Sequence, residues 1–213
     1  MTHDLDFLLR GVAIGFSIAA PVGPIGVLCI RRTLAEGRLS GLLSGLGAAT
    51  ADAAYGAIAA LGLTTLTSLL VGQQRWVRLI GGLFLLWLGF QTFRSRPAES
   101  PAAVSPTSGG RMLGAFASTF ALTLTNPMTI LSFVAVFAGL GLGAGAGSPL
   151  RALLMVLGVF LGSAAWWLLL SAAVDRLRSR FDQRSLVWVN RISGAVIAAF
   201  GIFAVASVVR GTG

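Results

Sequence analysis

Prolines interrupt two of the long apolar runs in this chain, and these breaks constrain its fold more than any other feature. The first break lies in residues 20–24 (APVGP) and the second in residues 125–127 (TNP). In a membrane-spanning helix, proline frees backbone groups that hydrocarbon cannot hydrogen-bond, so a break persists only where protein or a polar cavity covers it. Broken helices at matching places in two halves are typical of a substrate site in a secondary transporter. The two breaks together therefore predict a transport site.

The composition places the chain in a lipid bilayer. Of its 213 residues, 55% are hydrophobic and only 11% are charged, and the mean hydropathy is +0.85. A soluble domain cannot bury so large an apolar fraction. The apolar residues form stretches near the length that a spanning helix needs. We expect an all-α, polytopic membrane protein with six transmembrane helices, at residues 7–30, 41–64, 76–94, 112–141, 150–174 and 188–209.

The six predicted helices divide into two groups of three. Residues 95–111 are rich in Pro, Ser and Ala and are typical of a flexible linker. We therefore predict one three-helix unit at residues 1–94 and another at residues 112–213. Because each unit has an odd number of spans, the second enters the membrane from the opposite side, which predicts an inverted repeat. Each unit begins with a proline-broken helix, but the halves share no further residue-level identity.

Arginine placement predicts the orientation. All sixteen basic residues are Arg, and the first, third and fifth connections hold eleven of them. The positive-inside rule puts those connections in the cytoplasm and both termini outside it. The N-terminal run lacks an early positive cluster and a small-residue cleavage site, so we expect a retained helix there and not a cleaved signal peptide.

The residues at the breaks suit a zwitterion. Asn is a favoured helix N-cap and Pro is favoured at the first helical position, so a half-helix is expected to restart at each break. The N-terminal ends of these half-helices carry partial positive charge suited to a carboxylate, and the carbonyl ends of the preceding half-helices suit an ammonium group. A simpler alternative is that the prolines only kink two packed helices. The candidate substrate-binding residues are Pro21, Gly23, Pro24, Thr125, Asn126 and Pro127.

Asp52 is the only acidic residue within a predicted span. It shares a helix face with small residues at three- and four-residue steps, which let another helix approach closely and direct the carboxylate into the bundle. We expect Asp52 to carry a coupling proton or to bind the substrate's ammonium group, with a purely structural ion pair or cap as the alternative. The helix-packing residues expected near it are Gly45, Ala49, Tyr55 and Gly56.

Other functions lack the residues they need. One histidine, His3, and one cysteine, Cys29, provide neither a zinc site nor a nucleophile with its base, so we expect no enzyme and no metal or other cofactor. The glycine-rich residues 139–147 lack a P-loop lysine. The net charge of +9 comes from arginines that cluster between the apolar runs, where they set the orientation in the membrane. Nucleic acid is therefore not expected as a partner. The five tryptophans are interpreted mostly as anchors at the membrane interface or lipid-facing bulk.

The motifs resemble one known family. Residues 20–63 resemble the first two helices of the LysE/RhtB superfamily of amino-acid exporters, and residues 125–133 (TNPMTILSF) look like its fourth-helix Asn-Pro motif. The family's Pro-Gly-Pro appears here in residues 21–24 and its Gly-Asp as Ala51-Asp52. Met128 replaces a basic residue that is common in the family. The resemblance implies export of an amino acid or related small solute from the bacterial cytoplasm across the inner membrane, driven by an ion gradient.

These observations lead to one main hypothesis and two alternatives. The main hypothesis is a secondary active efflux transporter for an amino acid or a related zwitterion, coupled to protons. A metal-cation exporter is one alternative, although a lone intramembrane carboxylate is a poor transition-metal site. A lipid scramblase or a non-transporting membrane protein is the other. The small number of helices, together with the resemblance, also suggests a homodimer.

Overall fold

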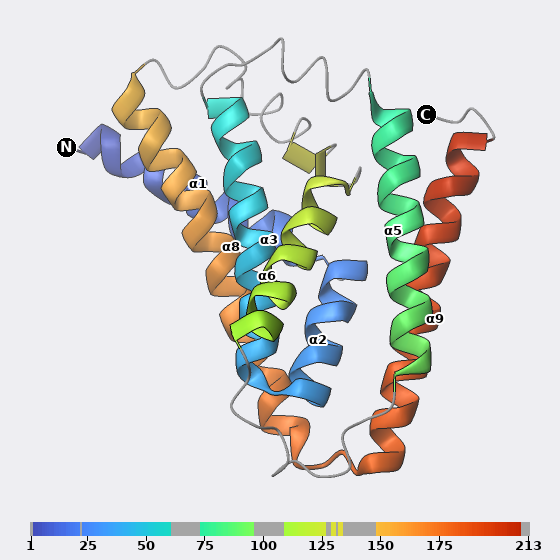
Figure 1. The fold of residues 1–213 in the computed structure, drawn as a ribbon. Helices are drawn as coiled ribbons and strands as arrows, with labels where there is room; N and C mark the ends of the chain where they lie inside the picture. The colour runs from blue at the N-terminus through green and yellow to red at the C-terminus, as the bar shows by residue number, and fades with distance from the viewer. Residues whose placement is uncertain are drawn as a thin grey trace.

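The computed structural model describes residues 2–21, 23–60, 73–95, 109–126, 129–130, 132–133 and 148–209. All of the elements in these residues are helices, and they form a bundle (Figure 1). The all-α prediction is therefore confirmed for the described part of the chain. The helices are α1 (Thr2–Ala19), α2 (Pro24–Glu36), α3 (Arg38–Ala60), α5 (Gln74–Arg94), α6 (Gly109–Leu124), α8 (Pro149–Arg178) and α9 (Gln183–Val209).

The first apolar run is broken at its prolines, as predicted. Helix α1 ends at Ala19 and α2 begins at Pro24, and the two are bent by 80°. Gly23 caps α2 in an extended conformation, with φ −119° and ψ −166°. Proline suits the first helical position because its fixed φ fits the helix and its missing N–H would have no partner there. The local chemistry thus explains why the helix restarts where it does.

The second break lies after α6, which ends at Leu124. The backbone N–H groups of Thr129 and Ile130 donate to the carbonyl oxygen of Asn126 at 3.1 Å and 3.3 Å. A residue whose carbonyl accepts the first bonds of the following turn occupies an N-cap position. The chain therefore turns at Asn126, as expected. Pro127, Met128 and most of the predicted linker lie outside the described residues.

Within the described residues, two helices are long and apolar enough to cross a membrane alone. They are Pro149–Arg178 and Arg184–Val208, and the bent pair of Leu5–Ala19 with Pro24–Glu36 forms a third candidate as one broken span. These spans agree with the prediction that the chain is a membrane protein. The six-span inverted repeat and the boundaries of its two units remain predictions.

The helices pack as a main body and an attached pair. Helices α1 and α3 both lie along α8, and α6 packs on α3. The contact between α1 and α8 is very close, because a Cβ added at Gly15 would lie 2.1 Å from the carbonyl oxygen of Val159. Helices α5 and α9 lie side by side and contact the body mainly through α2, which packs against α9 (Figure 1).

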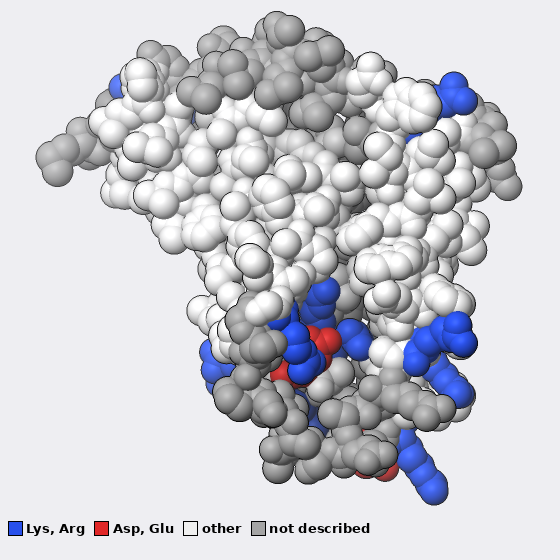
Figure 2. Space-filling model, viewed as in Figure 1, with Lys and Arg blue, Asp and Glu red and all other residues white. Residues whose placement is uncertain are grey.

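Charged residues gather at one end of the bundle. Figure 2 shows most of the visible Arg and acidic side chains at the lower end, below a wide uncharged band. At this end Arg31 Nη2 donates to Ser95 Oγ at 2.9 Å, and Arg178 Nε donates to the carbonyl oxygen of Leu34 at 3.1 Å. Residues of the first, third and fifth connections therefore meet at one end, in agreement with the predicted alternation of the spans. The cytoplasmic location of this end remains a prediction.

Candidate functional site

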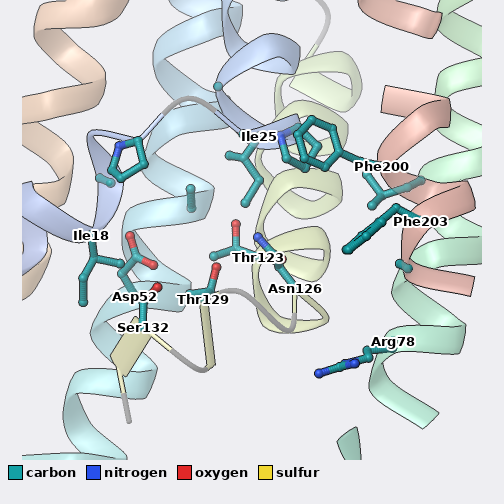
Figure 3. A pocket seen from close by; sticks show the side chains of 18 of the residues that line it. Ile18, Ile25, Asp52, Arg78, Thr123, Asn126, Thr129, Ser132, Phe200 and Phe203 are labelled. Carbon is teal, nitrogen blue, oxygen red and sulfur yellow. The ribbon is translucent and has the colours of Figure 1, made fainter. Parts of the chain in front are cut away.

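The two proline breaks line the same cavity, which has a volume of about 680 Å³ (Figure 3). We call it the central cavity. Thr125, in contrast, does not line it. The Thr125 hydroxyl donates to the carbonyl oxygen of Ala121 at 2.9 Å, and Pro127 lies outside the described residues. Of the residues singled out from the sequence, those that line the cavity are Pro21, Gly23, Pro24, Asp52 and Asn126.

The N-terminal end of α2 forms one wall of the central cavity. Gly23, Pro24, Ile25 and Gly26 all line it. No side chain caps this helix end, and the first backbone bond of α2 runs from Val27 N–H to the Gly23 carbonyl oxygen. The N–H groups of the first turn have no acceptor within the helix, so this wall carries the positive end of the helix dipole. An anionic group can be accommodated there.

The second break supplies a row of polar side chains. Thr123, Asn126, Thr129 and Ser132 line the cavity at steps of three residues. In Figure 3 the side chains of Thr123, Asn126 and Thr129 converge on the same space as Asp52. The sequence interpretation included only Asn126 of these four. The regular three-residue spacing around the Asn-Pro break is the signal that would have identified the hydroxyls.

Asp52 is 3% exposed and accepts a hydrogen bond from α8. Ser163 Oγ donates to Asp52 Oδ2 at 2.7 Å, and Trp167 Nε1 donates to Ser163 Oγ at 3.1 Å. These two consecutive hydrogen bonds fix the carboxylate at the cavity wall, because the Trp167 indole orients the Ser163 hydroxyl and this hydroxyl orients Asp52. The expectation of a membrane-interface role is wrong for Trp167, which is buried and lines the cavity.

The small residues of α3 lie where this helix meets its neighbours. A Cβ added at Gly45 would lie 2.3 Å from Trp167 Cβ, and one at Gly56 would lie 3.3 Å from a Val159 methyl. Ala49 is fully buried in the same helix. The Tyr55 hydroxyl donates to the carbonyl oxygen of Leu124 at 2.5 Å. Tyr55 thus satisfies a carbonyl group at the end of α6, next to the second break.

Helices α5 and α9 complete the central cavity. Arg78 lines it from α5; it is one of the five arginines that the sequence places outside the first, third and fifth connections. Phe200 and Phe203 add an apolar wall from α9 (Figure 3). The described lining therefore contains one acidic side chain, one basic side chain, several hydroxyls and aromatic surface. Such a site suits a small molecule with charges of both signs and an apolar portion.

The chain is similar to several known proteins over most of its length. The family described as LysE type translocator matches residues 16–207. The putative amino acid efflux protein YcgF of Bacillus subtilis is 27% identical over 202 residues, covering 93% of this chain and 95% of its own length. The threonine efflux protein of Salmonella typhi is 27% identical over 196 residues, covering 87% and 90%.

A further relative is named for chemotaxis and not for efflux. The chemotactic transduction protein ChpE of Pseudomonas aeruginosa is 31% identical over 194 residues, covering 90% of this chain and 91% of its own length. No solved structure matches the chain. The family match nevertheless spans nearly the whole sequence. The chain therefore belongs to the LysE type translocator family of membrane transport proteins.

Proposed function

We propose that this protein exports an amino acid or a related small zwitterion through the central cavity. The observation that carries the proposal is that both broken helices and the buried carboxylate of Asp52 line one cavity. Relatives named for the efflux of amino acids and of threonine support the same substrate class. In this proposal the protein lies in the bacterial inner membrane, with both termini outside the cytoplasm, and functions as a homodimer.

The substrate's charged groups bind opposite walls of the cavity. Its carboxylate accepts hydrogen bonds from the free N–H groups of Ile25 and Gly26 at the start of α2. Its ammonium group pairs with Asp52, whose other oxygen is held by Ser163. Phe200 contacts the substrate side chain. The hydroxyls of the polar row can hydrogen-bond a hydroxylated side chain, which makes threonine the first substrate to test.

Proton coupling is assigned to Asp52. It is the one carboxylate among the described lining residues of the central cavity. When a proton and an ammonium group compete for a single buried carboxylate, binding of one releases the other, which gives an exchange of substrate for proton. The main alternative use of Asp52 is as the ammonium site alone, with no proton carried.

A metal-cation exporter fits these residues less well. No group of three or more His, Cys, Asp or Glu side chains lies close enough to hold a metal ion in the described residues. The described lining of the central cavity includes neither a thiol nor an imidazole. Transition metals favour such ligands, and hard cations need several oxygens with more negative charge. An organic ammonium group needs only one carboxylate.

Reconstitution in lipid vesicles tests the proposal. Vesicles loaded with unlabelled threonine should take up labelled threonine, and a pH gradient should drive net flux. With D52N, the proposed competition predicts that both gradient-driven flux and exchange are lost, because the ammonium group loses its partner. Loss of gradient-driven flux with exchange retained would instead mean that Asp52 carries the proton without binding the ammonium group. D175N changes an acid of α8 outside the cavity lining and serves as the control.

Two results would refute the proposed function. One is that threonine, leucine and a wider set of amino acids show neither exchange nor net flux in the wild-type protein. The other is that the same vesicles translocate labelled lipid or divalent cations instead.

A further inference from the structure

A second, smaller cavity lies at the Arg-rich end of the bundle. Its volume is about 230 Å³, and it is lined by residues of α2, α5 and α6 and by Ser95. Its charged lining residues in the described part of the chain are Arg31, Arg32, Arg111 and Glu36. Three positive charges against one negative charge leave a net charge of +2. We call this space the arginine cavity; Figure 2 shows basic and acidic side chains together in a recess at this end of the molecule.

Arg31 and Glu36 neutralise each other in the arginine cavity. Arg31 Nη1 lies 3.0 Å from Glu36 Oε1. The remaining groups of the same guanidinium bind neutral partners, because Nε donates to Asn190 Oδ1 at 3.0 Å and Nη2 donates to Ser95 Oγ at 2.9 Å. Arg31 therefore connects α2 to α9 and to the end of α5. Glu36 also attracts Arg32 electrostatically, so this one carboxylate is shared, and the described lining keeps its net charge of +2.

Arg32 is a buried cation without a carboxylate contact among the described residues. The residue as a whole is only 8% exposed. The partners of Nη1 are Ser44 Oγ at 2.8 Å, the Ala115 carbonyl oxygen at 2.9 Å and Thr119 Oγ1 at 3.0 Å. Nη2 donates to Ser118 Oγ at 2.8 Å, and Nε donates to none of the described residues. All of these partners are neutral.

A buried cation that contacts no carboxylate and has positive neighbours is costly, and an anion that enters the cavity relieves this cost. The guanidinium group suits a carboxylate best, because it is planar, always protonated and presents several N–H donors. Arg32 is already fixed by α3 and α6, so little side-chain entropy is lost on binding. Arg111 lines the same cavity from an exposed position and adds a second positive charge.

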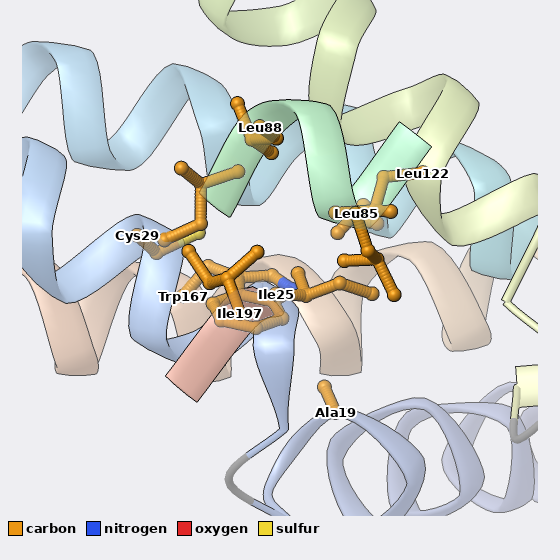
Figure 4. Close-up of a cluster of buried hydrophobic side chains, with 11 residues drawn as sticks. Ala19, Ile25, Cys29, Leu85, Leu88, Leu122, Trp167 and Ile197 are labelled. Atoms are coloured by element: carbon orange, nitrogen blue, oxygen red, sulfur yellow. The ribbon is translucent and has the colours of Figure 1, made fainter. Parts of the chain in front are cut away.

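An apolar layer separates the arginine cavity from the central cavity. Leu85 lines the central cavity, and Leu88, one turn further along α5, lines the arginine cavity. Both leucines belong to one cluster of buried apolar side chains with Ile25, Leu122 and Ile197 (Figure 4). The two cavities thus follow each other along α5, with this cluster closed between them. A molecule that passes from one to the other has to displace the cluster.

We infer that the arginine cavity is an entry subsite that binds the carboxylate of the transported amino acid before it reaches the central cavity. This inference rests on the proposed function. The substrate first pairs with Arg32 and Arg111 at the Arg-rich face. It then passes the apolar cluster when the α5–α9 pair moves relative to the body, and its carboxylate is transferred to the start of α2.

Transport from each face of membrane vesicles of known orientation tests the subsite. For threonine presented at the Arg-rich face, R32Q should raise the KM by about tenfold, as expected for the loss of one hydrogen bond between charged groups. R32K should restore part of the affinity. R111Q should also raise this KM. Because Arg111 is exposed, its replacement should not disturb the fold, so R111Q tests the subsite even if R32Q does not insert into the membrane. The KM from the opposite face should not change in any of these variants.

R94Q is the matched control. Arg94 is the last residue of α5, at the Arg-rich end of the bundle. Its guanidinium carbon lies 5.1 Å from the centre of the Phe90 ring, and the residue does not line the arginine cavity. A wild-type KM for R32Q and R111Q at the Arg-rich face, or an equal rise in R94Q, overturns the subsite while the proposed function stands. A wild-type protein that transports no amino acid overturns the proposed function, and with it the subsite.

Discussion

Ser163 of α8 donates its hydroxyl to Asp52 of α3 across 2.7 Å, where the two helices meet beside the central cavity. The donor is itself held by Trp167 Nε1 at 3.1 Å. A carboxylate that is almost fully buried depends on such donors, since water cannot replace them. The position and the ionisation of Asp52 therefore depend on a residue that the sequence does not mark as special.

Replacing Ser163 with Ala should reduce threonine export at unchanged protein abundance. The change leaves Asp52 Oδ2 without its hydroxyl donor in a buried site, which costs about 1–3 kcal/mol for a buried polar group. We expect at least a fivefold loss of gradient-driven export. Export rate divided by the amount of protein in the membrane is the measurement.

The matched control for this prediction is Ser171→Ala. Ser171 is a buried serine of the same helix, and its hydroxyl has no hydrogen-bond partner among the residues that the structure describes. Its loss should leave export unchanged. If Ser163 acts only through Asp52, the double variant S163A/D52N should be no worse than D52N alone. Full additivity, or equal loss in both serine variants, would remove this role of Ser163.

The breaks and the helical fold could be predicted from the sequence because their causes are local. A proline at a helix start and an Asn cap act within a few residues, so Pro24 and Asn126 reveal where helices restart. The small-residue face of α3 could also be predicted, since it depends only on spacing along one helix. Each of these features requires no knowledge of which helices become neighbours.

The remaining features of the site depend on contacts between helices distant in sequence. Ser163 is 111 residues from Asp52, and Arg32 is bound by residues of α6 that lie more than 80 positions away. Arg78 resembles a flanking charge until α5 is placed beside the second break. A serine or an arginine in such surroundings has no distinguishing local pattern, and only the packing assigns it to a site.

Replacing Gly45 with Ala should lower the thermal stability of the purified protein. The added methyl group would lie 2.3 Å from Trp167 Cβ and 2.6 Å from Cγ, so either α3 or α8 has to shift. Such overpacking costs about 1–3 kcal/mol. We expect a lower unfolding temperature in detergent, together with weaker export, because Trp167 holds Ser163.

Gly114→Ala is the control for that change. Gly114 lies in α6, and a Cβ there would meet nothing within 4 Å. Alanine is favoured over glycine within a helix by about 1 kcal/mol, so this variant should be as stable as the wild type or more so. An unfolding temperature for G45A that matches G114A would show that α3 and α8 are not tightly packed at this point.

Replacing Asn126 with Leu should impair export more than membrane insertion. Asn126 occupies the N-cap position of the turn after α6, and its side chain lines the central cavity. An Asn at an N-cap is favoured over an apolar residue by about 1 kcal/mol. Asn126→Ser keeps a capping oxygen and should retain more activity than the leucine variant. Export normalised to abundance is the measurement. Equal activity of all three proteins would reduce the second break to a kink that serves packing only.

The last prediction concerns orientation. The contacts of Arg31 with Ser95 and of Arg178 with Leu34 join residues of the first, third and fifth connections at one end, and the positive-inside rule places that end in the cytoplasm. The single native cysteine, Cys29, is buried and should not react with polar thiol reagents. In intact cells, such a reagent that cannot cross the inner membrane should label a cysteine introduced at Thr212 and should not label one introduced at exposed Ser179, between α8 and α9. Permeabilised cells, in which both positions should react, provide the control. Labelling of position 179 alone in intact cells would invert the assignment and would place the arginine cavity at the exit, where it could not serve as an entry subsite.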